Sequence, residues 1–512
     1  MNSGQRDAGS LMITVIAMIF IVSIIIFAGS TLVISGSRNV HKVSDMKQAH
    51  YMAEAGIEDA LSNPFVIRDA LLYGHSNVTS TSLSSFQFET NKVGEYEAEA
   101  IGDSGNKKIT ITSTGRVKNQ SGTTLAERTI VCQFELKPGS FYDLALDTAI
   151  ATAGNLTSGK VYIKLDSGVN PKTDADVYSD AAITSIAGTI PGSVIAQGEV
   201  TVNNNAIVTK DVIAKGKITI NNDVQVGGKV ISAGSYIDIN NKVQIGSDTV
   251  AYSTDKNGYA VYLGNNSTVH NIYTPKGASQ VKINGSYDSI KPISSPYPSP
   301  PTPPATDPTY PVPRKTLPAI DNEIKSSWIA RAQSDKVTYN GLTVGNNETI
   351  TLGNAYITGD FTLGNNAQLN IKEGSVIYVT GNISIANNAT VTALEADGDP
   401  KTTLISSLIT NNTFDIENNS IPTSVSLVAL GTGTSYLKNN SATTGAILVP
   451  NGSLEMKNNA AVHGGIFAKS IPNIGNNAEV YFNPLLNLGL PPTTTSSEAL
   501  TLLEWKEGAE KE

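Results

Sequence analysis

Two loops rich in acidic residues are the first places where this sequence could support chemistry. Asp166–Asp180 contains several aspartates, and Glu395–Asp399 reads EADGD. Clustered carboxylate oxygens are the ligands that Ca²⁺ prefers in proteins. Neither loop has the ordered ligand spacing of a calcium-binding loop, so we interpret both as solvated loops. The sequence therefore predicts no metal site and no cofactor.

Catalytic groups are also sparse between residues 141 and 484. An enzyme acting on a polysaccharide here would need grouped carboxylates and a basic residue. No two aspartates are adjacent in this part, and arginine is absent from Phe141 to Val312. His463 stands alone beside a glycine pair, and the five histidines show no paired ligand spacing. We therefore expect a protein that is not an enzyme.

The single cysteine, Cys132, excludes a disulfide within the chain. It lies in Arg128–Leu136, RTIVCQFEL, where apolar residues alternate and place it on the buried face of a strand. A buried structural thiol is the expected role. The 512 residues carry a net charge of −9, so the sequence lacks the basic surface that a nucleic-acid partner requires.

The N-terminal segment is the element on which the placement of the rest of the chain depends. Leu11 to Ile34 carries no charge and is long enough to cross a bilayer as a helix, which takes about 20 residues. From Arg38 to Leu61 apolar residues recur at steps of three and four, which indicates a continuing amphipathic helix. The sequence thus predicts one helix of about 50 residues, about 75 Å long at 1.5 Å per residue.

The stretches GSLMITVIAMIF and QAHYMAEAGIEDAL, the latter at Gln48–Leu61, carry a family resemblance. They resemble the N-terminal region of PilX-like type IV minor pilins, firmly over about the first 62 residues and loosely to residue 136. The alternative is a simple single-pass anchor. The residues that match the pilin-like signature are Ala53, Glu54, Ala55, Gly56, Ile57, Glu58 and Leu61.

This resemblance implies that a peptidase cleaves the leader between Gly9 and Ser10 after the helix enters the membrane. It also implies that the helix packs against other pilin-like subunits. Major pilins carry a glutamate five residues after the cleavage point, where this chain has Thr14. That departure fits a minor subunit and argues against the main filament subunit.

Residues 63–140 are expected to form a small α/β unit against this helix. Val66–Gly74 is predicted as a short helix and Ser76–Ser85 as a polar linker. Three alternating runs then predict an antiparallel meander with one buried face. These runs are Glu95–Ile101, Lys108–Val117 and Arg128–Leu136.

Asparagine doublets recur from about residue 141 onward, mostly at steps of 17 to 22 residues, with short β runs between them. This period predicts a right-handed parallel β-solenoid in which each coil buries its apolar residues against the next. Asparagine tolerates the left-handed corner of a coil and can form side-chain ladders. An Asn-rich β-sandwich is the rival interpretation. The predicted ladder comprises Asn204, Asn222, Asn241, Asn266, Asn347, Asn366, Asn388, Asn419, Asn440, Asn459 and Asn477.

The resulting prediction is a mainly β chain with a leader at 1–9, a helix at 10–62 and the α/β meander at 63–140. One solenoid lobe covers 141–290 and a second covers 337–484. Residues 291–336 form a proline-rich excursion followed by a helix at Asp321–Gln333 that is capped by Asp321 and docks on the solenoid. Residues 485–512 form a tail, in which Ala499–Trp505 is expected to be a short helix that can cap the last coil.

We interpret the whole as a non-enzymatic surface protein, a minor-pilin-like subunit that displays a solenoid for assembly, adhesion or spacing. The expected partners are membrane lipid along residues 11–34, other pilin-like subunits, and a surface polysaccharide or a host or abiotic surface. The leader would stay cytoplasmic and the bulk would lie outside. A carbohydrate-active or carbohydrate-binding β-helix and a plain membrane-anchored scaffold are the alternatives.

Overall fold

The computed structural model divides the chain into two compact units, Met1–Glu135 with Leu500–Glu512, and Leu136–Ala499. The residues that the structure describes are 4–62, 66–67, 70, 75–79, 86–89, 92–103, 107–136, 148–166, 174–294, 297, 311–315, 317, 320, 322–372, 374–394, 406–483 and 500–507.

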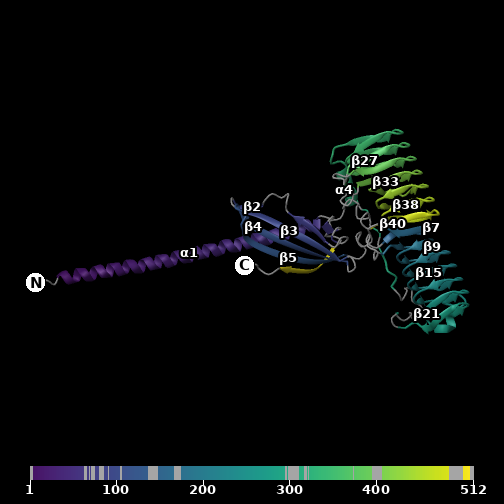
Figure 1. Cartoon of the computed structure of the whole chain (residues 1–512), viewed down its shortest axis with the longest axis horizontal. Helices are drawn as coiled ribbons and strands as arrows, with labels where there is room; N and C mark the ends of the chain where they lie inside the picture. Colours follow the sequence, from purple (N-terminus) through teal and green to yellow (C-terminus); the bar gives the residue numbers. More distant parts are fainter. Residues whose placement is uncertain are drawn as a thin grey trace. The chain divides into compact units, whose positions relative to one another are not determined.

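The first unit consists of one long helix and an antiparallel sheet (Figure 1). Helix α1 (Gly4–Ser62) confirms the predicted N-terminal helix, and its C-terminal half packs on the sheet. The sheet order is β1-β3-β4-β5-β41, with β2 beside β3. The strands are β1 (His75–Thr79), β2 (Phe86–Glu89), β3 (Lys92–Asp103), β4 (Lys108–Asn119), β5 (Thr124–Leu136) and β41 (Leu500–Glu507).

Strands β3, β4 and β5 confirm the predicted meander, but two neighbouring predictions are wrong. The polar stretch predicted as a linker contributes strand β1, which pairs with β3 from His75 to Thr79. The tail forms strand β41 on the edge of this sheet instead of a helix on the last coil. A short isolated helix is marginal in water, whereas the open edge of β5 offers a ladder of backbone hydrogen bonds. Of the predicted helix at Val66–Gly74, residues 66, 67 and 70 are helical and the rest lies outside the described residues.

Cys132 lies on the buried face of β5 with no exposed surface, as the alternation predicts. Burial raises the pKa of its thiol to about 11. At pH 8 only about one thiol in a thousand would then be the reactive thiolate.

Cys132 is therefore expected to react with a disulfide reagent such as DTNB more than about 100-fold more slowly in the native chain than in urea, where its pKa is about 8.5. The control is a Cys132→Ser, Ser121→Cys double variant, because Ser121 lies in an exposed turn and a thiol there should react at once. Fast labelling of native Cys132 would show that β5 opens readily.

The second unit is a parallel β-solenoid of about 14 coils, which confirms the predicted fold class. The predicted right-handed winding stays a prediction. The first lobe contains β6 (Thr148–Thr152), β7 (Leu156–Leu165), β8 (Asp176–Ser179), β9 (Ile183–Ile190), β10 (Val194–Ala196), β11 (Val200–Val202), β12 (Ile207–Val208), β13 (Val212–Ala214), β14 (Ile218–Ile220), β15 (Gln225–Val226), β16 (Val230–Ser232), β17 (Ile237–Ile239), β18 (Gln244–Ile245), β19 (Thr249–Ala251), β20 (Val261–Leu263), β21 (Thr268–Thr274), η1 (Gly277–Gln280), β22 (Val281–Ile283) and β23 (Ser286–Pro292).

The second lobe follows helix α4 (Asn322–Ala332) and completes the solenoid. It contains β24 (Thr338–Val344), β25 (Thr349–Leu352), β26 (Ala355–Leu363), β27 (Gln368–Lys372), β28 (Val376–Val379), β29 (Ile383–Ile385), β30 (Thr390–Leu394), β31 (Ser406–Thr410), β32 (Phe414–Ile416), β33 (Ile421–Thr423), β34 (Val425–Ala429), β35 (Thr434–Leu437), β36 (Ala442–Thr444), β37 (Ile447–Met456), β38 (Ala461–His463), β39 (Ile466–Ile474) and β40 (Ala478–Phe482).

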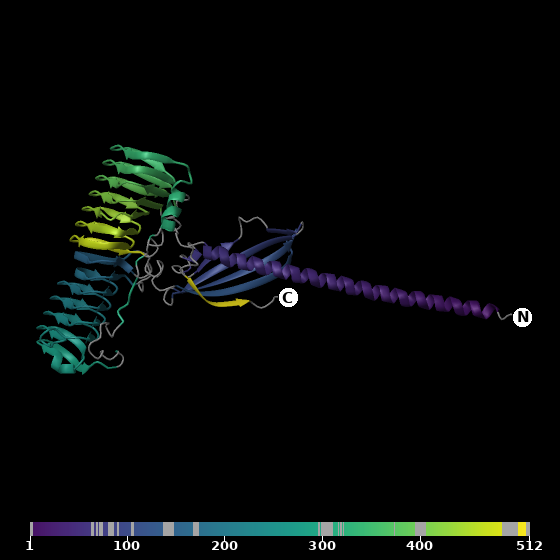
Figure 2. The same cartoon turned by 180° about the vertical axis from the view of Figure 1, so that it is seen from behind.

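The two lobes form one continuous stack, in an order that differs from the order of the sequence. The last coil of the second lobe lies on the first coil of the first lobe, because β39 pairs with β6 and β40 pairs with β7. Figure 2 shows this seam where the yellow coils meet the blue ones. Lys164 Nζ bonds Glu479 Oε1 across it at 2.7 Å, and a single apolar core runs through both lobes.

Residues 293–337, the return segment, connect the far end of the first lobe to the far end of the second, and the described part of this segment packs on one side of the stack. Helix α4 confirms the predicted docking helix: Ile324 and Trp328 are buried against Tyr378 and Phe467. Asp321, the predicted cap, lies outside the described residues. Earlier in the segment Lys315 Nζ bonds the buried Asp176 Oδ2 at 3.0 Å. The two lobes thus share one apolar core, and the return segment packs on both.

Candidate functional site

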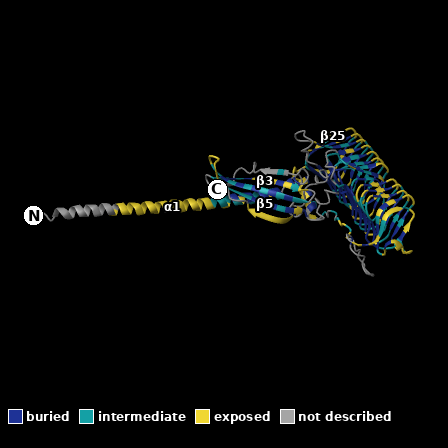
Figure 3. Ribbon diagram, turned by 60° about the horizontal axis from the view of Figure 1, so that its bottom comes forward, coloured by how far each residue is buried: buried dark blue, intermediate teal, exposed yellow. Residues whose placement is uncertain are grey.

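The first candidate surface is the N-terminal half of α1, whose described apolar side chains are exposed (Figure 3). Phe20, Ile26 and Phe27 are 64–75% exposed. This helix is long and apolar enough to cross a membrane, with a mean hydropathy of 2.1 in its best window, which contains no buried residue. Gly9 and Ser10, the predicted processing residues, lie within α1, and their side chains fall outside the described part.

The signature residues lie where α1 leaves this apolar half and packs on the sheet. Ala53 and Ile57 are buried, Ala55 and Leu61 are half-buried, and the charged Glu58 is exposed. A Cβ atom on Gly56 would lie 2.2 Å from Ser113 Oγ. On the sheet, a Cβ atom on Gly115 would lie 2.1 Å from Ala49 O and 2.4 Å from Ala53 N. The small residues of the signature thus allow the backbones of α1 and β4 to approach closely.

Polar contacts fix the same half of the helix on the sheet. Asp45 Oδ1 bonds Lys92 Nζ at 2.6 Å, and both side chains are largely buried. Asp59 Oδ2 accepts a hydrogen bond of 2.7 Å from the hydroxyl of Tyr96. Burial and this carboxylate raise the pKa of Tyr96 to about 12. Glu54 Oε1 lies 3.3 Å from His50 Nε2, one turn earlier on the same helix.

The asparagine doublets mark a left-handed corner of the coils that carry them, but the predicted ladder residue does not always occupy that corner. From Asn266 onward the predicted ladder residues have φ between 54° and 60°, a conformation that asparagine tolerates. In the three coils before Asn266 the corner instead falls on Asn205, Asp223 and Lys242. Asn204, Asn222 and Asn241 therefore lie one residue before the corner, and grouping them with Asn266 in one column is wrong.

Hydrogen bonds connect these residues from coil to coil. Asn366, Asn440 and Asn459 donate side-chain hydrogen bonds of 3.2, 3.3 and 3.0 Å to the asparagine of the preceding coil. In the first lobe the side-chain oxygens of Asn204, Asn222 and Asn241 accept from backbone N–H groups of the following coil at 2.9, 3.0 and 2.9 Å. A further side-chain column, absent from the predicted ladder, comprises Asn203, Asn221 and Asn240.

How much these bonds stabilise the solenoid stays a prediction. Asn459→Gly keeps the corner conformation and removes the amide, so we expect it to lower the free energy of unfolding by about 0.5–1.5 kcal/mol. Asn477→Gly is the matched control, because its side chain makes no hydrogen bond among the described residues although its φ is 58°. Equal denaturant midpoints for the two variants would assign the asparagines to corner conformation alone.

The solenoid has three outer faces that differ in chemistry. The covered face has apolar side chains that point away from the solenoid core and pack against the return segment. It is formed by β28, β31, β34, β8, β10, β13, β16 and neighbouring strands. The charged face, formed by β29, β32, β35, β11, β14, β17 and β20, carries ion pairs such as Lys438 with Asp415 and Glu417. The groove face is formed by β27, β30, β33, β36, β38, β40, β12, β15 and β18.

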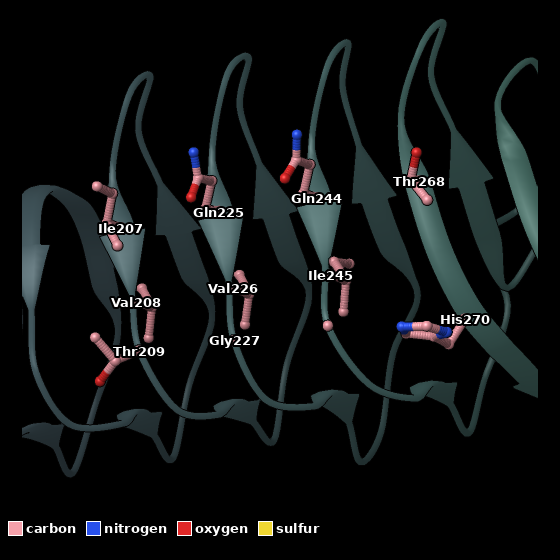
Figure 4. Close-up of a pocket in the computed structure, with 11 residues that line it drawn as sticks. Ile207, Val208, Thr209, Gln225, Val226, Gly227, Gln244, Ile245, Thr268 and His270 are labelled. Carbon is pink, nitrogen blue, oxygen red and sulfur yellow. The ribbon is translucent and has the colours of Figure 1, made fainter.

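A groove of about 410 Å³ lies on the groove face in the first lobe. Figure 4 shows the residues that line this groove, in rows that cross successive coils. Gln225 and Gln244 occupy equivalent positions on β15 and β18. A second row contains Gly227 and Gly246, where no side chain fits because a Cβ atom on either would lie 2.3–2.5 Å from a backbone oxygen of the neighbouring coil. The repeated segments VQVGG and VQIGS could have indicated this feature in the sequence.

The groove is bounded by Ile207 and Thr209 at one end and by Thr268 and His270 at the other. None of its lining residues is an acid, a lysine or an arginine. His270 Nδ1 lies 2.6 Å from Asp288 Oδ2 on the next coil. The groove therefore offers neutral hydrogen-bonding groups and no paired carboxylates for acid–base catalysis.

The acidic residues near the first lobe are largely engaged by cations. Asp174 pairs with Lys210, Asp176 with Lys315, and Asp180 with Arg314 at 3.5 Å. The loop Glu395–Asp399 lies outside the described residues. Within the described ranges no three His, Cys, Asp or Glu side chains converge as metal ligands would.

His463 lies at the seam between the lobes. Its ring stacks on Tyr481, with ring centroids 4.3 Å apart, and its Nδ1 lies 3.6 Å from Asp166 Oδ1. Hydrogen bonds from Lys164 and Tyr481 lower the pKa of Glu479. This cluster fastens the last coil of the second lobe to the first coil of the first lobe.

Comparisons with known proteins identify a match over part of the chain. A family model described as a domain of unknown function, DUF7305, matches residues 311–487, which contain α4 and the second lobe. No curated protein matches. A crystal structure of the competence-associated pilin ComZ from Thermus thermophilus is 12% identical, covers 91% of this chain and 98% of its own, and has a TM-score of 0.23. An ice binding protein from an Antarctic bacterium Flavobacteriaceae is 11% identical, with 67% and 98% covered and a TM-score of 0.17.

Proposed function

We propose that this chain is a non-enzymatic, minor-pilin-like surface subunit that is held by α1 and displays a β-solenoid outside the cell. In this proposal residues 11–34 lie in the membrane or among the helices of neighbouring subunits. The leader is removed between Gly9 and Ser10. The solenoid acts as the displayed part, for adhesion or spacing.

The observation that carries the proposal is the division of α1 into two unlike halves. The apolar half around Phe20–Phe27 is exposed, although burying a single such side chain is worth about 1.5–3 kcal/mol. The other half is fixed on a sheet through Gly56 and Gly115. An apolar surface of this extent marks a site for lipid or for other subunits.

Cleavage and location of the native chain test the proposal. Amino-terminal sequencing of the membrane-derived protein should begin at Ser10, and Gly9→Leu should leave the leader attached. Gly36→Leu is the control, because Gly36 lies in the exposed part of the same helix. Protease added to intact cells should release the solenoid.

Each outcome separates the proposal from its alternatives. An intact leader on a surface-exposed chain would leave a plain membrane-anchored scaffold. A chain recovered from the soluble fraction of lysed cells, and untouched by protease on intact cells, would overturn the proposal.

A further inference from the structure

We propose that the groove on the first lobe binds a neutral linear polysaccharide along the solenoid axis, which would make it the adhesive site of the displayed domain. The biological use of this site rests on the proposed function, whereas the binding itself rests on the groove. The groove has a volume of about 410 Å³, within the range of about 300–1,000 Å³ that is usual for ligand sites.

The wall of the groove offers repeated hydrogen-bonding groups to a ligand. The amides of Gln225 and Gln244 are exposed, and neither has a side-chain hydrogen-bond partner among the described residues. Each amide supplies two donors and an acceptor. The two amides recur one coil apart, about 4.8 Å, so they suit a ligand whose hydroxyl groups also repeat along a chain.

No side chain fills the floor of the groove, because the packing of the coils leaves room only for glycine there. Gly227 and Gly246 have no room for a side chain because the backbone of the preceding coil lies too close. The groove crosses the coils from Thr209 to His270, roughly 14 Å at the spacing between strands. Ile207, which is 40% exposed, adds an apolar patch for the C–H face of a sugar ring.

The charges around the groove select among ligand classes. An anionic polymer would need lysine or arginine partners, and none lines the groove. An extended peptide binds by adding a strand to an open sheet edge. Here β12, β15 and β18 are paired on both sides, so only side chains and glycine backbone face outward. These features favour a neutral, hydroxyl-rich chain.

Affinity electrophoresis of the purified full-length chain in detergent tests the proposal. The neutral probes are hydroxyethyl cellulose, galactomannan and linear dextran, and the anionic probe is polygalacturonate. A Gln225→Ala, Gln244→Ala double variant should bind the retarding neutral polymer at least 10-fold more weakly. The matched control is a Thr201→Ala, Thr219→Ala double variant, because these residues occupy outward positions on the neighbouring charged face.

The outcomes are distinct from those of the cleavage and location experiment. No retardation by any neutral probe, or stronger binding of polygalacturonate, would overturn the proposed ligand class even if the chain is a surface subunit. An equal loss in the Thr201, Thr219 variant would overturn the assignment to the groove. Thermal unfolding of each variant, expected to match the native chain, excludes a folding defect as the cause.

Discussion

Replacement of Trp328 by alanine is expected to lower the free energy of unfolding of the solenoid unit by about 3–5 kcal/mol, the range for deleting a buried large aromatic side chain. Trp328 is 2% exposed and fills the contact between α4 and strands of the second lobe. Its removal leaves a cavity over the apolar row that includes Tyr378 and Phe467, which rigid β-coils cannot move to fill.

The chain carries its own control, because it has only two tryptophans. Trp505 on β41 is 44% exposed, so Trp505→Ala should change stability by no more than about 0.5 kcal/mol. Far-UV circular dichroism during urea unfolding measures the transition of the solenoid unit in both variants, because Trp505 lies in the first unit and its fluorescence would not report on α4. Similar denaturant midpoints for both variants would mean that α4 contributes little to the solenoid.

Replacement of Gly115 by alanine is expected to destabilise the first unit by about 1–3 kcal/mol, the usual range for overpacking. The new methyl group would lie 2.1–2.4 Å from backbone atoms of Ala49 and Ala53. Backbone atoms of a helix cannot rotate away as a side chain can, so α1 would have to lift from β4. That movement would also weaken the contact at Gly56.

Gly36→Ala is the matched control, since no atom lies within 4 Å of a Cβ atom at that position. Alanine there removes the helix penalty of glycine and should stabilise α1 by about 0.5–1 kcal/mol. Limited proteolysis of the full chain in detergent measures release of the helix from the sheet. Equal protection of the two variants would show that the close approach at Gly115 is not required.

Local features of the sequence determined the main elements correctly. The uncharged run at Leu11–Ile34 and the helical spacing after Arg38 predict α1, because hydropathy and periodicity are properties of neighbouring residues. The doublet period predicts the coils for a similar reason: each coil repeats the same requirement for inner apolar residues and for a left-handed corner.

The sequence did not determine which residue of each coil occupies the left-handed corner. A doublet shows that a corner is near, but not which of its residues adopts the positive φ. In two coils of the first lobe Asp223 and Lys242 occupy the corner, and asparagine precedes them. The hydrogen bonds between coils decide the position, and those bonds depend on the coil above and below.

Only the tertiary structure decided which distant segments meet. Coils present nearly equivalent edges, so the sequence alone cannot specify that β39 and β40 pair with β6 and β7. Strand β41 likewise joins β5 because a sheet edge is open there, across more than 350 residues of chain. The groove exists because Gly227 and Gly246 fall in one column on stacked coils. Periodicity therefore determined the elements, whereas pairing between edges, which depends on the whole fold, determined the seam, the sheet and the groove.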